Sequence, residues 1–373
     1  MIIPALLPDE LAWGYLCRVG RVNTLKSLQG IYDMISDTGL LKASNEEPRS
    51  MAHVLAALAG ASPDSIITGH TLLPFARAVR AAGACVPHKD SDDFLGRAAL
   101  TFPFGKTARL QLCPACIAED IDFHGVSYWR RAHQLKCVVI CTKHACGLQS
   151  VQTTRWDVLP EHLADKAEAP TPDIVEHALS SPVIRMYEEV CSFFAMRVRP
   201  FSMESVSRLI QDRSQVMCPK SPTQARRLST MALEQIGGPW LLNQFPGLFE
   251  RRTGYLDSLD RTLGKPKVAL ASQYYALALA LLFPTADEAM KCLLQMESQG
   301  ATHIASSQTQ GQETPTQVAC RLGDKRELAI RALLDGASIR RAATVAGVRA
   351  HELEALVLAC AKEGLSHLSQ RVH

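Results

Sequence analysis

The spacing of apolar residues near the start of the chain predicts two short helices joined by a turn. Within residues 8–30, Leu11, Tyr15 and Val19 recur every four positions, which places them on one face of a helix. A turn is expected at residues 20–23, and Thr24 has the side chain of an N-cap for the second helix. We therefore predict a helix-turn-helix arrangement in this part of the chain.

A second helical pair is predicted further along. Residues 51–58 are apolar at helical spacing, and Gly60 ends that pattern. Ser62 followed by Pro63 is typical of a helix start, with a capping hydroxyl and then proline in the first turn. We expect the first hundred residues to form an all-helical domain.

Beyond residue 100 the apolar runs become shorter and cysteines and histidines cluster, which indicates a small metal-dependent module. Helical periodicity then returns, until a segment rich in Ser, Thr, Gln and Gly that has little to bury. We predict a mainly α protein with these parts: a helical domain at 1–100, a zinc-finger module at 101–155, a helical bundle at 156–298, a linker at 299–318 and a helix-turn-helix-like module at 319–373.

Composition places the chain among ordinary globular proteins. Of its 373 residues, 47% are hydrophobic and 21% charged, and the net charge of +3 is too small to indicate a nucleic-acid binder. Any contact with DNA must therefore come from local basic patches. The sequence has no run of eighteen apolar residues and no secretory signal at its start, so we expect a cytoplasmic protein without a membrane span.

The strongest chemical signal is a pair of metal-binding knuckles. Cys113 and Cys116 form a Cys-Pro-x-Cys motif, and Cys141 and His144 follow after 24 intervening residues with the same spacing. Three thiolates and an imidazole are a complete ligand set for tetrahedral Zn²⁺. Because no coordination position is left open for water, we predict a structural zinc ion and no zinc-dependent hydrolysis.

Several readings of the neighbouring residues stay open. Cys146 lies two residues after His144 and has the chemistry to replace it as the fourth ligand. A second site built from His124, His133 and Cys137 is less favoured because it lacks a paired knuckle. With twelve cysteines spread along the chain, we expect metal ligation for the cluster and buried thiols elsewhere.

An aromatic and basic stretch lies between the knuckles, where Tyr128 and Trp129 precede Arg130 and Arg131. Two functions fit this stretch of residues equally well. The arginines can bind phosphate while the tryptophan stacks on a base, or all four can pack the module with the guanidinium groups in water.

These motifs together resemble the zinc-finger core of the TniQ family, which includes the TnsD-type target selectors. The matching segments are Cys113 to Cys116, Glu119-Asp120, the aromatic-basic stretch, His133-Gln134-Leu135, Cys141 and His144, and nearer the start Leu7 to Leu11, Tyr15-Leu16-x-Arg18 and His70 to Phe75. The resemblance covers about residues 1–155. Lys136 departs from the proline usual in the family, and the second finger of some members has no counterpart here.

This resemblance implies a transposition adaptor. Such a protein couples a target-DNA complex, or an RNA-guided CRISPR effector complex, to the transposon's AAA+ ATPase regulator and so to the transposase. The sequence leaves open whether the target is read directly or through guide RNA, and whether the chain forms a homodimer.

A DNA-reading module is predicted at the C-terminus. Ala343, Gly347 and Leu353 have the spacing of a helix-turn-helix, in which a small residue, a turn glycine and a locking apolar residue recur. In that geometry Arg349 and His351 point at base edges. The alternative is a helical hairpin whose charges are merely solvated.

Phosphate contacts in the same module are assigned to Arg340 and Arg341. Asp335, Glu352 and Glu354 lower the local positive charge, so weak or partner-assisted binding to DNA is expected.

The function expected overall is a non-catalytic adaptor for target selection. A stand-alone zinc-containing transcription regulator is the alternative, which needs only operator DNA and usually a symmetric dimer. An enzyme is disfavoured because the sequence lacks His-Glu-x-x-His, a phosphate-binding loop and a zinc set with a vacant position.

Overall fold

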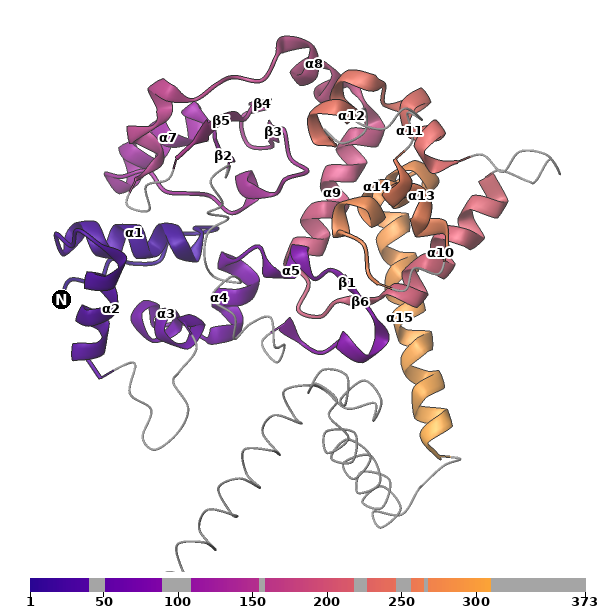
Figure 1. Cartoon of the computed structure of the whole chain (residues 1–373), viewed down its shortest axis with the longest axis horizontal. Helices are drawn as coiled ribbons and strands as arrows, with labels where there is room; N and C mark the ends of the chain where they lie inside the picture. Colours follow the sequence, from indigo (N-terminus) through magenta and orange to yellow (C-terminus); the bar gives the residue numbers. More distant parts are fainter. Residues whose placement is uncertain are drawn as a thin grey trace, which may run out of the picture. The chain divides into compact units, whose positions relative to one another are not determined.

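The computed structural model describes residues 1–39, 51–88, 109–153, 158–217, 227–245, 256–264 and 268–309 (Figure 1). The chain divides into two compact units, residues 1–300 and 301–373. Of the second unit, only the end of one helix lies within the described residues. The described residues are mainly helical, as the sequence predicted, and they also contain short two-stranded sheets.

The N-terminal part is helical. Its helices are α1 (Ala12–Val22), α2 (Leu28–Asp37), α3 (Met51–Ala59), α4 (Pro63–His70) and α5 (Leu73–Ala76). The prediction for the second pair is confirmed, because the Ser62 side chain caps α4 by accepting the backbone N–H of Ser65. Gly60 has φ +63°, the left-handed conformation that ends α3.

The start of the second helix was predicted wrongly. Thr24 has φ +56°, whereas an N-cap residue needs an extended backbone, so it cannot begin the helix. Ser27 is the cap instead, with an extended backbone and a hydroxyl that accepts the N–H of Gly30. Helix α1 also continues to Val22, and the turn between the two helices comes after it.

A small mixed module follows. It contains β2 (Arg109–Leu112), α7 (Pro114–His124), the 3-10 helix η4 (Ala132–Gln134), β3 (Ile140–Cys141), β4 (Cys146–Gly147) and β5 (Gln149–Gln152). Strands β2 and β5 pair antiparallel, and β3 and β4 form a short antiparallel hairpin. The N-terminal segment docks on this module, since the N–H of Leu11 donates to the carbonyl of Trp129 (2.8 Å).

The rest of the first unit is a helical assembly, as predicted. Its helices are α8 (Pro172–Ser180), α9 (Pro182–Met196), α10 (Met203–Met217), α11 (Leu228–Gln235), α12 (Gly238–Gln244), α13 (Asp257–Asp260), α14 (Ser272–Leu282) and α15 (Ala286–Thr309). The shorter pieces are β1 (Val79–Arg80), η1 (Ala82–Ala84), η5 (Pro160–His162), η6 (Ala164–Lys166), β6 (Phe201–Ser202) and η8 (Arg261–Leu263).

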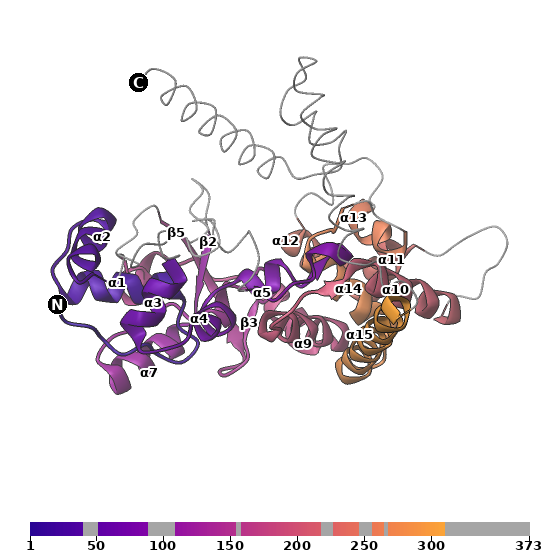
Figure 2. The ribbon, with the colours of Figure 1, turned by 90° about the horizontal axis from the view of Figure 1, so that it is seen from below.

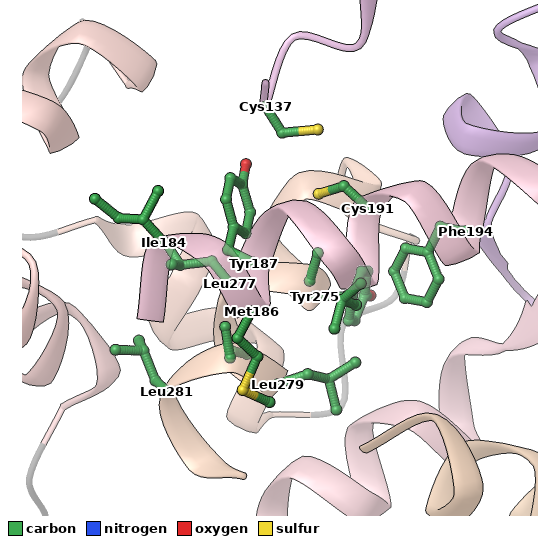
Figure 3. Packing of buried hydrophobic residues seen from close by; sticks show 14 of the residues in the cluster. Cys137, Ile184, Met186, Tyr187, Cys191, Phe194, Tyr275, Leu277, Leu279 and Leu281 are labelled. Atoms are coloured by element: carbon green, nitrogen blue, oxygen red, sulfur yellow. The ribbon is translucent and has the colours of Figure 1, made fainter. Parts of the chain in front are cut away.

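The apolar helix α14 lies at the centre of this assembly. It is buried along nearly its whole length, packs against α9 and α10, and with α9 supplies most of the side chains drawn in Figure 3. Helices α10 and α14 lie side by side in both ribbon views (Figure 2). Strand β1 pairs in parallel with β6, which ties the N-terminal region to the segment after α9.

Packing is continuous across the predicted domain limits. The largest core includes Val79, Val139, Tyr187 and Leu277, so it joins the N-terminal region, the metal-binding module and the later helices. The predicted limits at residues 100 and 155 lie outside the described residues, so they stay predictions.

Helix α15 continues to Thr309 and so includes the first part of the predicted linker, whose role as a connection stays a prediction. Once a helix has formed, each further residue adds a backbone hydrogen bond at low cost, so a polar segment can extend it. The C-terminal helix-turn-helix at 319–373 lies outside the described residues. Within the described ranges we find no helix whose length and hydropathy would let it cross a bilayer.

Candidate metal centre

The first knuckle is placed by the start of helix α7. Cys113 is the N-cap residue, with an extended backbone, and Pro114 occupies the first turn. The Cys113 sulfur accepts the backbone N–H of Cys116 at 3.5 Å, which holds both thiols on the same side of the helix start. A helix N-terminus also favours negative charge, so it suits a pair of thiolates.

The second knuckle is placed by the β3–β4 hairpin. Cys141 faces Cys146 across the hairpin, and the intervening turn carries His144. Ala145 has φ +48°, and its N–H donates to the carbonyl of Cys141 at 2.8 Å. This tight turn directs the imidazole of His144 back towards the start of α7.

The four predicted donors come together. The ligand atoms of Cys113, Cys116, Cys141 and His144 all lie within 4.8 Å of one another. The Cys116 and Cys141 sulfurs are 3.7 Å apart, and the Nδ1 atom of His144 lies 3.3 Å from the sulfur of Cys116. A tetrahedron with metal–sulfur bonds of about 2.3 Å has edges of about 3.8 Å. The group therefore has the donors and spacing that a tetrahedral metal ion needs.

Glu119 orients the histidine. The Nε2 atom of His144 lies 2.9 Å from a carboxylate oxygen of Glu119, which also pairs with Lys143. The hydrogen bonds from Lys143 and His144 lower the pKa of Glu119 to about 2, so its carboxylate accepts the ring N–H. In the neutral imidazole the lone pair is then on Nδ1, the atom that faces the thiols. The same bond raises the pKa of His144.

Burial disfavours the charged thiolate form of the three cysteines unless a cation is bound. Cys113, Cys116 and Cys141 are all buried. Burial raises the pKa of Cys116 well above its usual range, and the neighbouring Cys113 and Cys141 thiols add to the effect. Three thiolates can share this space only if a positive ion neutralises them, and binding such an ion releases protons.

Cys146 is adjacent to this group but not part of it. Its sulfur lies 3.5 Å from that of Cys113, whereas the group of mutually close donors includes His144 instead. The less favoured second site is not assembled among the described residues. His133 lies against Cys116, with Nε2 3.9 Å from the sulfur, while Cys137 faces Tyr187 and Cys191 near α9 (Figure 3). His124 packs against Tyr128.

The arginines between the knuckles bond within the protein. Arg130 pairs with the buried Asp120. Arg131 donates to Asp9 (3.0 Å) and to the carbonyl of Thr68 (2.6 Å). These contacts favour the packing interpretation, and contact of the two arginines with DNA stays a prediction.

Stacking of a base on Trp129 is contradicted. Its side chain is 1% exposed, and its ring N–H donates to the carbonyl of Val158 (2.8 Å). An indole enclosed in this way offers no face to a base. The predicted DNA contacts Arg340, Arg341, Arg349 and His351 lie outside the described residues.

The region that contains this site matches a known protein family. The TniQ family model matches residues 1–148, a segment that includes all four donors. The comparison with curated proteins gave no match. The family match supports a DNA-binding role associated with transposition. Residues 1–148 of the chain are thus similar to the TniQ family.

Proposed function

We propose that this protein is a non-catalytic target-selection adaptor for DNA transposition, built around a structural zinc ion. The observation that carries the proposal is the four-donor group inside the TniQ region, with Glu119 bound to the far nitrogen of His144. A carboxylate behind a ligand histidine is the usual support of a bound zinc ion.

Zinc is the metal that suits these donors best. Three thiolates and one imidazole in a tetrahedral arrangement select zinc over magnesium or calcium, which prefer oxygen ligands. When bound, the ion would hold the start of α7 against the β3–β4 hairpin. Because all four positions are filled by side chains, the ion would stabilise the fold and would bind no water molecule that it could activate.

An adaptor needs separate surfaces for its partners. In our proposal the zinc-containing TniQ region binds the AAA+ ATPase regulator, which recruits the transposase. Arg340, Arg341, Arg349 and His351 of the C-terminal module would contact target DNA, directly or beside an RNA-guided complex. The metal-binding module shares one core with α9, so the zinc ion would help to hold the proposed ATPase-binding region in place.

The test is a binding assay with the purified full-length chain, the ATPase regulator and transposase of the neighbouring genes, and target DNA. The wild-type protein should bind both zinc and the ATPase, whereas Cys113→Ser should bind neither. The matched control is Cys292→Ser, which removes a partly buried thiol on α15 outside the donor group.

A second variant keeps the test informative if Cys113→Ser does not fold. Arg349→Ala should weaken DNA binding and leave ATPase binding unchanged. Zinc-loaded wild-type protein that binds a specific DNA site as a symmetric dimer, but never the ATPase, would identify a transcription regulator instead.

A further inference from the structure

A fifth sulfur atom lies beside the metal-binding group, on the partner strand of the hairpin. The Cys146 sulfur is 3.5 Å from that of Cys113, while Cys146 faces Cys141 across the β3–β4 ladder. Its position brings a thiol into van der Waals contact with one of the proposed ligands.

Cys146 is also the most exposed cysteine of this cluster. The three ligand cysteines are 1%, 3% and 2% exposed at Cys113, Cys116 and Cys141. Cys146 is partly exposed. An oxidant that arrives from water therefore meets Cys146 before any of the ligand sulfurs.

We propose that Cys146 and Cys113 form a redox-sensitive pair, in which a peroxide drives a disulfide between them and releases the metal ion. The inference rests on the proposed metal binding of this site. A disulfide has a sulfur–sulfur bond of about 2.05 Å, so the two atoms need to approach by only about 1.5 Å.

The reaction balances with hydrogen peroxide as the oxidant. The Cys146 sulfur, as thiolate, attacks one peroxide oxygen, the oxygen–oxygen bond breaks, and the other oxygen leaves as water after taking up a proton. Cys146 is then a sulfenic acid. The Cys113 sulfur attacks that sulfur with the electron pair that it had shared with the metal, and hydroxide leaves and is protonated to a second water. Two thiols and one peroxide thus give one disulfide and two waters.

Loss of Cys113 as a ligand would leave the metal ion without its fourth protein ligand. The ion would retain only Cys116, Cys141 and His144, and its fourth position would open to water and chelators. The start of α7 would then no longer be joined through the metal to the hairpin. Reduction by a thiol reverses the disulfide and restores the ligand, so the change is a switch and not permanent damage.

The test uses the full-length, zinc-loaded protein treated with hydrogen peroxide. Zinc release is followed with a chromogenic chelator, and peptide mass spectrometry under non-reducing conditions identifies the disulfide. We expect release of one zinc ion per chain together with a Cys113–Cys146 disulfide, and recovery after reduction and addition of zinc. Cys146→Ser should bind zinc normally and release it several-fold more slowly, while Cys292→Ser should behave as wild type.

Three results would overturn the inference. Cys146→Ser could release zinc at the wild-type rate, or the disulfide could join another pair such as Cys141 and Cys146. Loss of zinc from Cys146→Ser before any oxidation would make Cys146 a ligand. These results leave the proposed function intact, whereas wild-type protein that holds no zinc as purified would remove the basis of both proposals.

Discussion

Both ring nitrogens of His144 have partners. These two contacts explain how a residue in a turn can keep the orientation that a metal ligand needs. Its Nδ1 atom faces the thiols and its Nε2 atom contacts Glu119. The glutamate lies on α7, the helix whose start carries the first knuckle. A single helix therefore positions two ligands directly and a third through a hydrogen bond.

Replacement of Glu119 by Gln should weaken zinc binding by about 10–100-fold, because the imidazole loses a charged acceptor and becomes a poorer ligand. Competition with a chelator of known affinity measures the effect. Glu168→Gln is the matched control, since that side chain is 82% exposed and pairs with Arg109 away from the donor group. Equal zinc affinity of the two variants would contradict the role given to Glu119.

Glu188 should make the stability of the fold depend on pH. Its carboxylate accepts the N–H of Val139 at 3.2 Å, and burial raises its pKa from 4.5 to about 7. Since the folded-state pKa is above the unfolded-state value, the contribution of Glu188 to stability is fully present below about pH 4.5 and is lost as the pH rises through about 7.

The variant Glu188→Gln should remove this decline, which we expect to be on the order of 2 kcal/mol after allowance for partial exposure. Urea unfolding at a series of pH values measures it. Glu189→Gln, an exposed neighbour on α9, provides the comparison. A decline of the same size in Glu188→Gln would assign the effect to another group.

At the scale of elements, the hairpin that carries His144 fits tightly against the segment that leads into α8. A Cβ atom added at Gly147 would lie 2.7 Å from Pro170 and 2.7 Å from Val175. Proline cannot move aside easily, so the hairpin itself would have to shift. Any such shift would be passed to Cys141 and Cys146, the paired residues next along the ladder.

Gly147→Ala should therefore lower the free energy of unfolding by about 1–3 kcal/mol through overpacking. Gly69→Ala is the matched control, because no neighbouring atom lies within 4 Å of an added Cβ there. In α4 that change should be neutral or stabilising by up to about 1 kcal/mol. Denaturant unfolding of the zinc-loaded variants tests the pair, and equal stabilities would contradict the packing argument.

Elements with a local chemical signal were predictable from sequence, and those that depend on distant partners were not. The cap at Ser62 and the two knuckles are short patterns with a direct physical cause. The error at Thr24 arose because two hydroxyl residues compete to cap the same helix, and only the backbone conformation decides between them.

Distant pairings gave no signal. Strand β1 pairs with β6 more than a hundred residues later, and nothing in either two-residue segment indicates the partner. The interior position of Trp129 could not be predicted either, because aromatic and basic neighbours occur both in cores and at nucleic-acid surfaces.

At the scale of the whole molecule, the metal site and the helical assembly share one core. Cys113, Cys116 and Cys141 belong to the same cluster of buried residues as the apolar face of α14. A ligand set that is continuous with the main core should influence the stability of the whole first unit, residues 1–300.

Zinc removal by a chelator should accordingly lower the midpoint of the main unfolding transition, by on the order of 10 °C, without creating a separate early transition. Differential scanning calorimetry of the full-length protein with and without chelator measures this. The control is the same chelator saturated with zinc. An unchanged main transition with a new, smaller one below it would mean that the metal-binding module unfolds independently.

The hydrogen bond from Val139 to Glu188 has a consequence for biosynthesis. The glutamate is on α9, beyond the segment that matches the family, so a nascent chain that has emerged only as far as residue 148 lacks the surface on which Val138, Val139 and Ile140 pack. All four zinc ligands would have left the ribosome before α9, the helix against which their module packs, had been synthesised. Capture of the ion early in translation would then protect these strands from aggregation until α9 arrives.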